Sequence, residues 1–355
     1  MKRDNRDYVI DCIKSSAIIL MVIGHSIQLF NGEVYRGEKE FYDNILYKVI
    51  YSFHMPLFML MSGYLYYFSR KKYISCFKNT IIKLSQYFVP ILTFASIKTV
   101  WNIISSNKGG SFNIFHLLVE EVYNIFHVLW FLWAIIYSIL IIELIYLVRN
   151  RMNVNIVITI ILCFFFMTPD LLMGNVYKYT ILYFGIGYEM NRKQLFKEMK
   201  TQKKTLFVGG AVWVLLILLY ERKHYIYVSG FSLINSEYGM IEQFIIDIFR
   251  WGIGLAGALS VWGGFQLFFS YKQRKIADSI GRIMNFIGSN TLIIYSFSTE
   301  IFNEIMAELT EECTFSYIRT FVLGVGVIII CLIISYILGC RYMRPFRKAL
   351  TGRSG

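Results

Sequence analysis

His25 is the residue whose type and position best suit it to chemistry, because it lies in the long apolar segment AIILMVIGHSIQ. An ionisable group inside a bilayer costs roughly 3 kcal/mol or more, so the few that occur there are candidates for function. Burial favours the neutral imidazole, which is the form that a general base requires. The same form suits a structural histidine that donates a hydrogen bond to a neighbouring helix, and the residues alone leave both interpretations open.

Two more ionisable residues precede His25 on the same predicted helix. Lys14 lies eleven residues before His25, about three turns, so the two side chains share one helix face about 16 Å apart along the axis. Asp11 precedes Lys14 by three residues and can pair with it or cap the helix. This stripe would connect a basic group at the cytoplasmic end with an imidazole deeper in the membrane. A lysine that snorkels to the interface would explain Lys14 without chemistry.

The next apolar segment, SFHMPLFMLMSGYLYYFSRKK, holds further candidates. Pro56, close to His54, predicts a kink because its ring removes a backbone hydrogen bond, and in a bilayer the freed carbonyl needs a partner or lines a cavity. Ser62 and Gly63 offer a small-residue surface on which another backbone can come close. A kinked packing helix would account for the same residues. If Pro56 instead lines a cavity, His54 and Ser62 are candidates for substrate binding.

Basic residues follow this segment in a dense cluster, Arg70, Lys71, Lys72, Lys78 and Lys83. Lys and Arg at this place could bind the phosphates of an anionic cytosolic cofactor. The positive-inside rule and contact with anionic lipids explain the same charges without a ligand. The sequence contains no GxxxxGK[ST] motif and no GxGxxG motif after a strand, so nothing indicates nucleotide hydrolysis.

Residues near the predicted outer interface give weaker signals. Trp130 could stack on a sugar ring, although aromatic belts are ordinary at this depth. His116 and His224 fall in outer connections and are expected at the surface. Asp247 and Arg250, three residues apart in one span, are expected to neutralise each other. The six cysteines occur singly, with no histidine at metal-ligand spacing, so we expect neither a disulfide framework nor a metal site.

These residues need a membrane scaffold to position them, and the composition predicts one. Of 355 residues, 56% are hydrophobic and 17% are charged, and the mean hydropathy is +0.51. A soluble chain of this length would need more charge to cover its surface. We predict an all-α, polytopic membrane protein made of a single domain, residues 1–355, without an appended soluble domain. About ten apolar runs are long enough to cross a bilayer, some of them short: 13–30, 46–68, 84–105, 126–148, 154–169, 176–190, 205–220, 241–270, 287–305 and 316–340.

The distribution of basic residues predicts the orientation of these spans. Counted from the N-terminus, the odd-numbered segments outside the spans contain 26 Lys and Arg residues, and the even-numbered segments contain five. By the positive-inside rule, both termini are cytoplasmic. The longer outer connections are then 31–45, 106–125 and 221–240. We therefore attribute the net charge of +13 to the topology of the spans and not to binding of nucleic acid.

Several motifs occur in an order that resembles the integral-membrane acyltransferase-3 family. The opening motif is Arg6, then IDCIK (Ile10–Lys14), then AIILMVIGH, which ends at His25. It matches the family's pattern of a basic residue, here Lys14, followed by ten intervening positions and a histidine. The later motifs are FHMPLFMLMSGYLY (Phe53–Tyr66), RKK with Lys83 and Pro90, LWFLW (Leu129–Trp133), YFGIGY (Tyr183–Tyr188) and IGSNTLIIY (Ile287–Tyr295). FHMPLFMLMSGYLY is similar to the motif of the family's second span, and most similar to the branch that contains fucose O-acetylase-like proteins. The resemblance covers nearly the whole chain.

The resemblance implies an enzyme of the bacterial inner or plasma membrane. Such an enzyme takes acetyl-CoA, or another acyl-CoA, from the cytoplasm and acylates a hydroxyl of a sugar, a lipid-linked glycan or a similar molecule. Membrane lipids and the glycan acceptor are the partners it implies, and the oligomeric state stays open. His25 would be the general base or an acyl carrier, and Lys14 and Asp11 would shape the donor entrance.

The same resemblance assigns the coenzyme A phosphates to Arg70, Lys71, Lys72 and Lys83. Candidates for the oxyanion stabiliser are Ser62, Trp130 and a backbone N–H at the kink of Pro56, and the sequence does not rank them.

The sequence departs from the family pattern at two positions. Lys14 stands where many members have arginine, a change that the fucose-acetylase-like branch shares, and Ser298 replaces a histidine that often follows the IGSNTLIIY motif. Two other functions suit a polytopic chain: a transporter or flippase for a glycan intermediate, and a non-catalytic partner in glycan assembly. The sequence shows no inverted repeat, which counts against transport, and the presence of His25 counts against a non-catalytic role.

Overall fold

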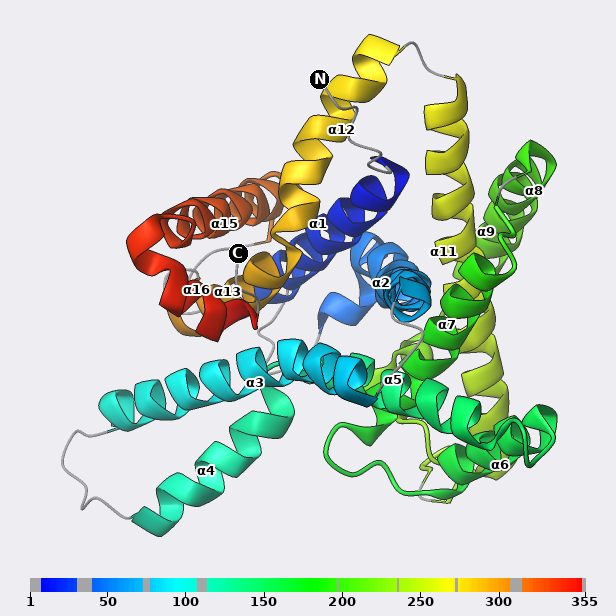
Figure 1. The fold of residues 1–355 in the computed structure, drawn as a ribbon, viewed down its shortest axis with the longest axis horizontal. Helices are drawn as coiled ribbons and strands as arrows, with labels where there is room; N and C mark the ends of the chain where they lie inside the picture. The colour runs from blue at the N-terminus through cyan, green and yellow to red at the C-terminus, as the bar shows by residue number, and fades with distance from the viewer. Residues whose placement is uncertain are drawn as a thin grey trace. The chain divides into compact units, whose positions relative to one another are not determined.

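The computed structural model describes residues 8–30, 40–72, 77–106, 114–196, 198–234, 236–271, 274–306 and 315–352. These residues form helices joined by turns, and none of the residues in these ranges lies in a β-strand (Figure 1). The α-helices, in chain order, are α1 (Tyr8–Phe30), α2 (Ile45–Lys72), α3 (Phe77–Ser106), α4 (Ile114–His127), α5 (Trp130–Val148), α6 (Val154–Met167), α7 (Gly174–Arg192), α8 (Met199–Lys204), α9 (Gly210–Leu218), α10 (Ile226–Ser229), α11 (Met240–Tyr271), α12 (Arg274–Ser289), α13 (Thr291–Glu300), α15 (Tyr317–Leu338) and α16 (Arg344–Thr351).

Within the described ranges, seven helical segments are long and apolar enough to cross a membrane, which confirms an all-α, multi-pass membrane protein. They are Tyr8–Leu29, Ile45–Lys71, Thr80–Ile104, Trp130–Val148, Met199–Leu218, Met240–Ser270 and Tyr317–Leu338. The fifth joins α8 and α9 through the π-helix η2 (Thr205–Gly209).

The other three predicted spans coincide with helices of a different kind. The run 154–169 falls on α6, which is apolar but has 14 residues, and 176–190 falls on the more polar α7. The run 287–305 is divided between the end of α12, α13 and the π-helix η4 (Ile301–Met306). The count of ten spans therefore stays a prediction.

The chain forms two compact units, and each is described by itself. Unit 1 comprises Met1–Phe68, Tyr183–Val228 and Phe244–Ser335, and unit 2 comprises Ser69–Leu182, Ser229–Gln243 and Tyr336–Gly355. His25, Lys14, Asp11, His54 and Ser62 belong to unit 1. Arg70, Lys71, Lys72, Lys83 and Trp130 belong to unit 2.

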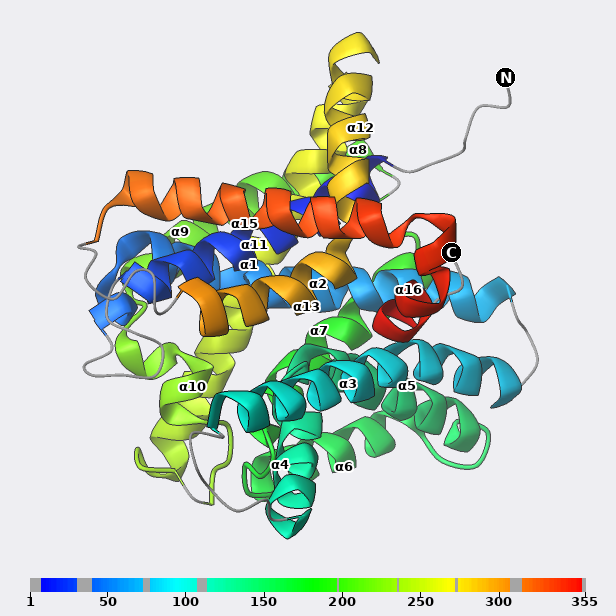
Figure 2. The ribbon, with the colours of Figure 1, turned by 90° about the vertical axis from the view of Figure 1, so that its left-hand side faces the viewer.

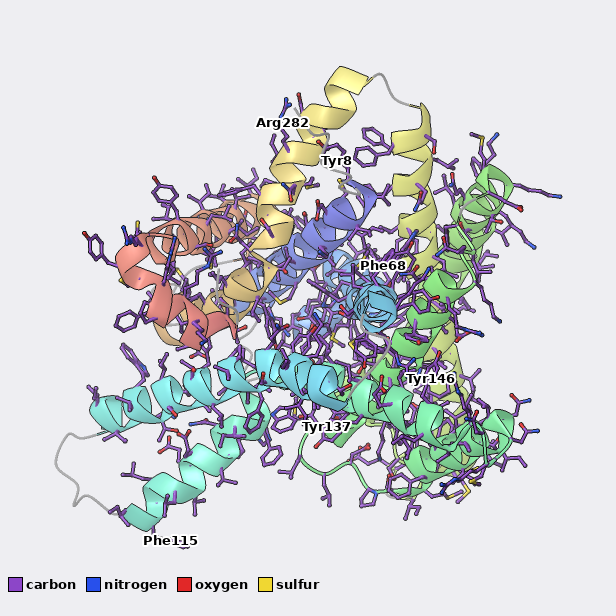
Figure 3. All side chains as sticks on the ribbon, in the orientation of Figure 1. Tyr8, Phe68, Phe115, Tyr137, Tyr146 and Arg282 are labelled. Atoms are coloured by element: carbon purple, nitrogen blue, oxygen red, sulfur yellow. The ribbon has the colours of Figure 1, made fainter. Side chains whose placement is uncertain are left out.

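In unit 1, α1 packs against α12, α13 and η4 (Figure 1). Small residues permit a close approach: a Cβ atom at Gly288 of α12 would come within 2.9 Å of the Asp11 carbonyl oxygen. Ser15 donates hydrogen bonds to the carbonyls of Asp11 and Met284, and thus joins α1 to α12. Figure 3 shows Tyr8 at the start of α1 beside α12, where its ring lies over Gly281. These contacts fix the helix that presents His25.

Two glycines set the contact between α2 and α7 in unit 1. A Cβ atom at Gly63 would collide with the backbone carbonyl of Phe184, and one at Gly187 would collide with that of Leu60. The expectation that Gly63 lets another backbone come close is confirmed. Asn191 at the end of α7 adds a hydrogen bond from its Nδ2 to the Tyr64 carbonyl, at 2.6 Å. The residue Pro56 lies inside α2, which continues through it as one helix.

In unit 2, α3 and α4 pack against each other as a helical hairpin (Figure 1). Polar side chains join them: Ser96 donates to Glu121 at 2.8 Å, Asn102 to Glu120 at 2.6 Å and Asn124 to Thr99 at 2.9 Å. Apolar side chains of α4 such as Phe115, labelled in Figure 3, and Val122 are exposed. The contact between Asn124 and Thr99 is buried. A buried polar contact between helices with apolar side chains outside suits a lipid environment. The sequence predicts an outer connection over 106–125 and no helix there. The structure differs, because most of the described residues of this segment belong to the helix α4.

An ion pair between buried Lys178 and half-buried Asp170 holds the turn between α6 and α7 in unit 2. The ammonium of Lys178 lies 2.8 Å from Asp170 Oδ1 and also donates to the carbonyls of Thr168 and Pro169. Asp170 Oδ2 accepts the backbone N–H groups of Phe231 and Ser232. Both charges of the ion pair between Lys178 and Asp170 are therefore satisfied within the protein.

Elsewhere in unit 2, α16 packs on α3 (Figure 2).

Candidate active site around His25

His25 lies near the C-terminal end of α1, where the helix contacts α2. Its side chain is half-buried, and its ring centroid lies 6.2 Å from that of Phe302. The preceding residue, Gly24, leaves room for the ring of Tyr51, which would lie 2.7 Å from any Cβ atom at position 24. Glycine at this position therefore lets α2 approach the helix turn that presents the imidazole.

The imidazole is held by Gln28, one turn further along α1. His25 Nδ1 lies 2.8 Å from Gln28 Oε1. An amide oxygen only accepts hydrogen bonds, so Nδ1 carries the hydrogen in this contact. In the neutral ring Nε2 then holds the lone pair. No described residue hydrogen-bonds to Nε2.

Two tyrosines of α2 hold Gln28 in turn. Gln28 Nε2 donates to the hydroxyl of Tyr47 at 2.8 Å, and the hydroxyl of Tyr51 donates to Gln28 Oε1 at 3.3 Å. The two tyrosine rings stack with their centroids 3.9 Å apart, and Tyr47 is completely buried. The amide is thus fixed from both ends by a neighbouring helix.

His54 lies one turn beyond Tyr51 on the same helix. Its side chain is buried, its Nδ1 donates to the Ile50 carbonyl at 2.9 Å, and its ring packs edge-on against Tyr51 at 4.6 Å. Tyr51 in turn donates to Gln28, the residue that holds His25. The structure therefore brings His54 to the same site, and its predicted role in substrate binding stays a prediction.

Lys14 and Asp11 lie on the same unbroken helix as His25, as the spacing predicts. Lys14 Nζ is 4.0 Å from the Asp11 carboxylate, which confirms that the two residues can pair. Asp11 is buried and Lys14 is half-buried. Their predicted part in catalysis stays a prediction.

Ser62 is a weak candidate for an oxyanion donor in this arrangement. Its hydroxyl donates to the Phe58 carbonyl at 2.8 Å, one turn earlier on α2. That hydrogen is therefore occupied in a backbone contact. Ser62 could still accept a hydrogen bond from a substrate hydroxyl.

In unit 2, Arg70 already has protein partners. Its Nε lies 2.8 Å from Glu143 Oε1, and its guanidinium stacks on the ring of Tyr146, 3.4 Å from the centroid. Lys71 is exposed and Lys83 is half-buried, whereas the side chain of Lys72 lies outside the described part of the chain. An anionic ligand would have to compete with Glu143 for Arg70.

Trp130, also in unit 2, begins α5. Its ring is half-buried and packs edge-on against Phe131 at 5.8 Å. Neighbouring aromatic residues are engaged with the backbone, since Trp133 Nε1 donates to the Ile125 carbonyl at 2.7 Å. This arrangement agrees with an aromatic belt and leaves a sugar-stacking role for Trp130 as a prediction.

The expectation that His224 is a surface residue was wrong. The 3-10 turn η3 (Arg222–His224) buries the imidazole, whose Nδ1 accepts the Glu221 backbone N–H at 2.8 Å and whose ring lies 4.2 Å from that of Phe249. Burial lowers the pKa of His224 to about 4. His116, by contrast, is exposed as predicted.

Arg250 and Asp247 form the predicted intrahelical pair on α11, with 2.8 Å between Nη1 and Oδ1. Arg250 Nε also donates to the His224 carbonyl at 2.9 Å. The pair therefore fixes the turn after α9. Among the residues that the structure describes, no group of three or more His, Cys, Asp or Glu side chains is arranged to hold a metal ion.

A family model for an acyltransferase domain, acyltransferase-3, matches residues 7–340. The chain belongs to the acyltransferase-3 family. The resemblance inferred from the motifs is thereby confirmed, and this acyltransferase-3 protein is a membrane enzyme of that class. The match spans nearly all of the chain, including the helices of the His25 site.

Two similar proteins share a name. Nodulation protein NolL of Mesorhizobium japonicum is 24% identical over 353 residues, which cover 94% of this chain and 87% of the relative. Nodulation protein NolL of Sinorhizobium fredii is 28% identical over 243 residues, which cover 63% of this chain and 60% of the relative. No solved structure matches this acyltransferase-3 protein significantly.

Gln28, Tyr47 and Tyr51 were not predicted as site residues from the sequence. A signal for Gln28 was available, because it lies three residues after His25 and therefore adjoins it on the helix. No sequence spacing connects the tyrosines with His25, since they lie on a different helix. Their part in the site follows only from the packing of α2 against α1.

Proposed function

We propose that this acyltransferase moves an acyl group, in the first instance acetyl, from cytosolic acyl-CoA to a hydroxyl of a cell-surface or lipid-linked glycan. The observation that carries the proposal is the hydrogen bonding of the two ring nitrogens of His25. In a chain matched by an acyltransferase model over residues 7–340, its Nδ1 is anchored and its Nε2 has no partner among the described residues. An imidazole anchored in this way has one nitrogen free to take a proton.

The chemistry assigned to His25 is general-base catalysis. Nε2 removes the proton of the acceptor hydroxyl while the hydroxyl oxygen forms a bond with the carbonyl carbon of the thioester. The resulting tetrahedral intermediate collapses with cleavage of the C–S bond. The coenzyme A thiolate leaves and takes the proton from the imidazolium, so that the base is restored and an ester and a thiol are formed.

A second route passes through an acyl-imidazole. Here Nε2 attacks the carbonyl carbon of the thioester, the C–S bond breaks, and coenzyme A departs as the thiolate. The acceptor hydroxyl then attacks the acyl-imidazolium, the N–C bond to Nε2 breaks, and the hydroxyl proton passes to the thiolate. Both routes require the same nitrogen of His25. Lys14 and Asp11, on the cytoplasmic side of the helix, would shape the donor entrance in either case.

Donor binding is assigned to basic residues of unit 2. Lys71, Lys72 and Lys83 are proposed to bind the coenzyme A phosphates, and Arg70 joins them only if phosphate displaces Glu143. His54, Ser62 and Trp130 are proposed to contact the acceptor. The family match supports an acyl donor. The similarity of FHMPLFMLMSGYLY to the fucose O-acetylase-like branch supports a sugar acceptor.

The proposed setting is the inner or plasma membrane of a bacterium, with about ten spans and both termini in the cytoplasm. The excess of Lys and Arg in alternate segments supports this orientation. Chemistry inside the membrane domain would allow a cytosolic thioester to meet an extracytoplasmic hydroxyl.

The test is transfer of radiolabelled acetyl from acetyl-CoA to endogenous glycans, in membranes that contain wild-type protein or His25→Ala. We expect label in glycan with the wild type and a loss of about 10²–10⁴-fold in the variant, the usual effect of removing a general base. Full transfer by a correctly inserted His25→Ala protein would contradict the assignment. Binding of coenzyme A would separate this function from that of a transporter or a non-catalytic partner.

A further inference from the structure

We propose that Gln28 is the positioning residue of this site, and that Tyr47 and Tyr51 make it so by fixing its amide. Gln28 would set both the tautomer and the ring plane of His25, so that Nε2 and not Nδ1 faces the substrate. The inference rests on the proposed function of His25. It assigns roles to three residues that have no place in the chemistry described above.

The first step is the direction of the hydrogen bond. Gln28 Oε1 lies 2.8 Å from His25 Nδ1 and cannot donate, so it selects the tautomer that carries hydrogen on Nδ1. The other tautomer would place two lone pairs against each other. The partner of one ring nitrogen thus decides which nitrogen is basic.

The second step is the anchoring of the amide itself. Gln28 is 7% exposed, and its two ends have different partners: Nε2 donates to the Tyr47 hydroxyl at 2.8 Å, and Oε1 accepts from the Tyr51 hydroxyl at 3.3 Å. Both tyrosines are buried and stack on each other. The amide cannot rotate without losing these contacts, and each lost contact would leave a buried polar group unsatisfied.

The third step is the choice of a neutral residue. A carboxylate often orients a catalytic histidine, and it also stabilises the imidazolium. Inside a bilayer an unpaired carboxylate is costly to bury, whereas an amide supplies the same acceptor oxygen without a charge. Gln28 would therefore act through orientation alone. We expect its removal to cost about 10–100-fold, the loss typical of removing a hydrogen bond that orients a metal-binding histidine.

A structural role for Gln28, as a link between α1 and α2, makes a different prediction. In that case Gln28→Met and Gln28→Glu would both disturb the packing, and activity would follow the amount of folded protein. In the positioning role, Gln28→Glu retains an acceptor for Nδ1–H. Its carboxylate is not unpaired, because the hydroxyls of Tyr47 and Tyr51 can both donate to it. We therefore expect Gln28→Glu to restore turnover and Gln28→Met not to. Gln202→Met is the matched control, because Gln202 is a buried glutamine of the same unit that donates to the Phe196 carbonyl at 2.9 Å.

The experiment measures kcat and the KM for acetyl-CoA per folded protein, in purified wild type, His25→Ala, Gln28→Met, Gln28→Glu and Gln202→Met. We expect Gln28→Met to lose kcat by 10–100-fold with KM changed less than threefold, Gln28→Glu to recover at least a third of wild-type kcat, and Gln202→Met to retain kcat. If Gln28→Met does not fold, Tyr47→Phe decides, and we expect its kcat to fall because the amide loses a partner.

Two results would overturn the inference and leave the proposed function intact. One is wild-type kcat in Gln28→Met, or in Tyr47→Phe if that variant decides, together with loss of activity in His25→Ala. The other is an equal loss of kcat in Gln28→Met and Gln28→Glu. Retained transfer by His25→Ala would instead overturn the proposed function and this inference together.

Discussion

Neutral side chains build the hydrogen-bond chain at His25, and this is what a membrane interior favours. Gln28, Tyr47 and Tyr51 supply donors and acceptors without an ionised group. Two buried charges of the same unit, Arg250 and Asp247, form a pair with 2.8 Å between them. A charge that is paired within one helix costs far less than an isolated one. The site can therefore hold a base ready without a second charge beside it.

His224 gives a prediction about pH. Burial lowers its pKa from the ordinary value of 6.5 to about 4, so the unfolded state binds more protons than the folded state between these values. The free energy of unfolding contributed by this residue is therefore fully present above pH 6.5 and is lost as the pH falls toward 4. We expect the melting temperature of the solubilised protein to fall across this window.

The matched variant for this prediction is His224→Asn. Its Oδ1 can accept the Glu221 N–H in place of Nδ1 but does not titrate. We expect a lower melting temperature at pH 7, because contact with the ring of Phe249 is lost, and a shallower decline toward pH 4. Identical declines in wild type and variant would show that protonation of His224 does not limit stability.

Individual residues were predictable where the signal lies within one helix. The pairing of Arg250 with Asp247 and the proximity of Lys14 to Asp11 follow from a spacing of three. The environment of His224 was not predictable, because its partners lie in the turn η3 and on α11. Only the tertiary fold brings these two elements together. The ring–ring contacts of Tyr47 and Tyr51 likewise depend on tertiary packing.

Glycine pairs decide how the helices of unit 1 come together. Gly63 of α2 and Gly187 of α7 each face a backbone carbonyl of the other helix, so neither can accept a side chain without a shift of the backbone. Such close crossings are a common basis of helix association in membranes. Gly185, on the same helix α7, serves as a control, because no heavy atom of the described residues outside its own helix turn lies within 4 Å of its Cβ position.

We predict that Gly187→Ala destabilises the protein by about 1–3 kcal/mol, the usual cost of overpacking. Gly185→Ala should be neutral or slightly stabilising, because alanine is favoured over glycine within a helix by about 1 kcal/mol. Thermal melting of the two variants in detergent checks the difference. Equal melting temperatures would mean that α2 and α7 do not cross at these glycines.

The elements themselves were predicted best where hydropathy is strong. Seven predicted spans correspond to long apolar helices because hydrocarbon requires unbroken runs of apolar residues. The hydropathy pattern did not indicate α4, whose acidic residues Glu120 and Glu121 look like those of an exposed loop. They are instead paired with Asn102 and Ser96 of α3. The π-helices η2 and η4 also lack a sequence signal that we could identify.

At the scale of the whole molecule, the charge distribution makes a prediction about topology. Segments with most of the Lys and Arg residues should face the cytoplasm, so α16 should lie inside and α4 outside. We test this with single cysteines at His116, which is exposed on α4, and at Lys348 on α16, in a background without native cysteines. A membrane-impermeant maleimide added to intact cells should label the first and not the second.

Labelling of the cysteine at position 348 from outside, with the cells intact, would overturn the orientation. Labelling at both sites only after permeabilisation would place α4 on the cytoplasmic side and would contradict the predicted count of spans before it. Either result would also remove the reason to expect a cytosolic acyl donor at the basic residues Lys71 and Lys83.

The most direct test of the central claim is a single measurement on purified protein in lipid nanodiscs. It follows release of coenzyme A thiol from acetyl-CoA, in the presence of a glycan fraction, by wild type and by His25→Ala of equal folded amount. The account predicts acceptor-dependent thiol release by the wild type and a rate about 10²–10⁴-fold lower for the variant. Equal rates for the two proteins would contradict it, because neither route of acyl transfer proceeds without Nε2 of His25.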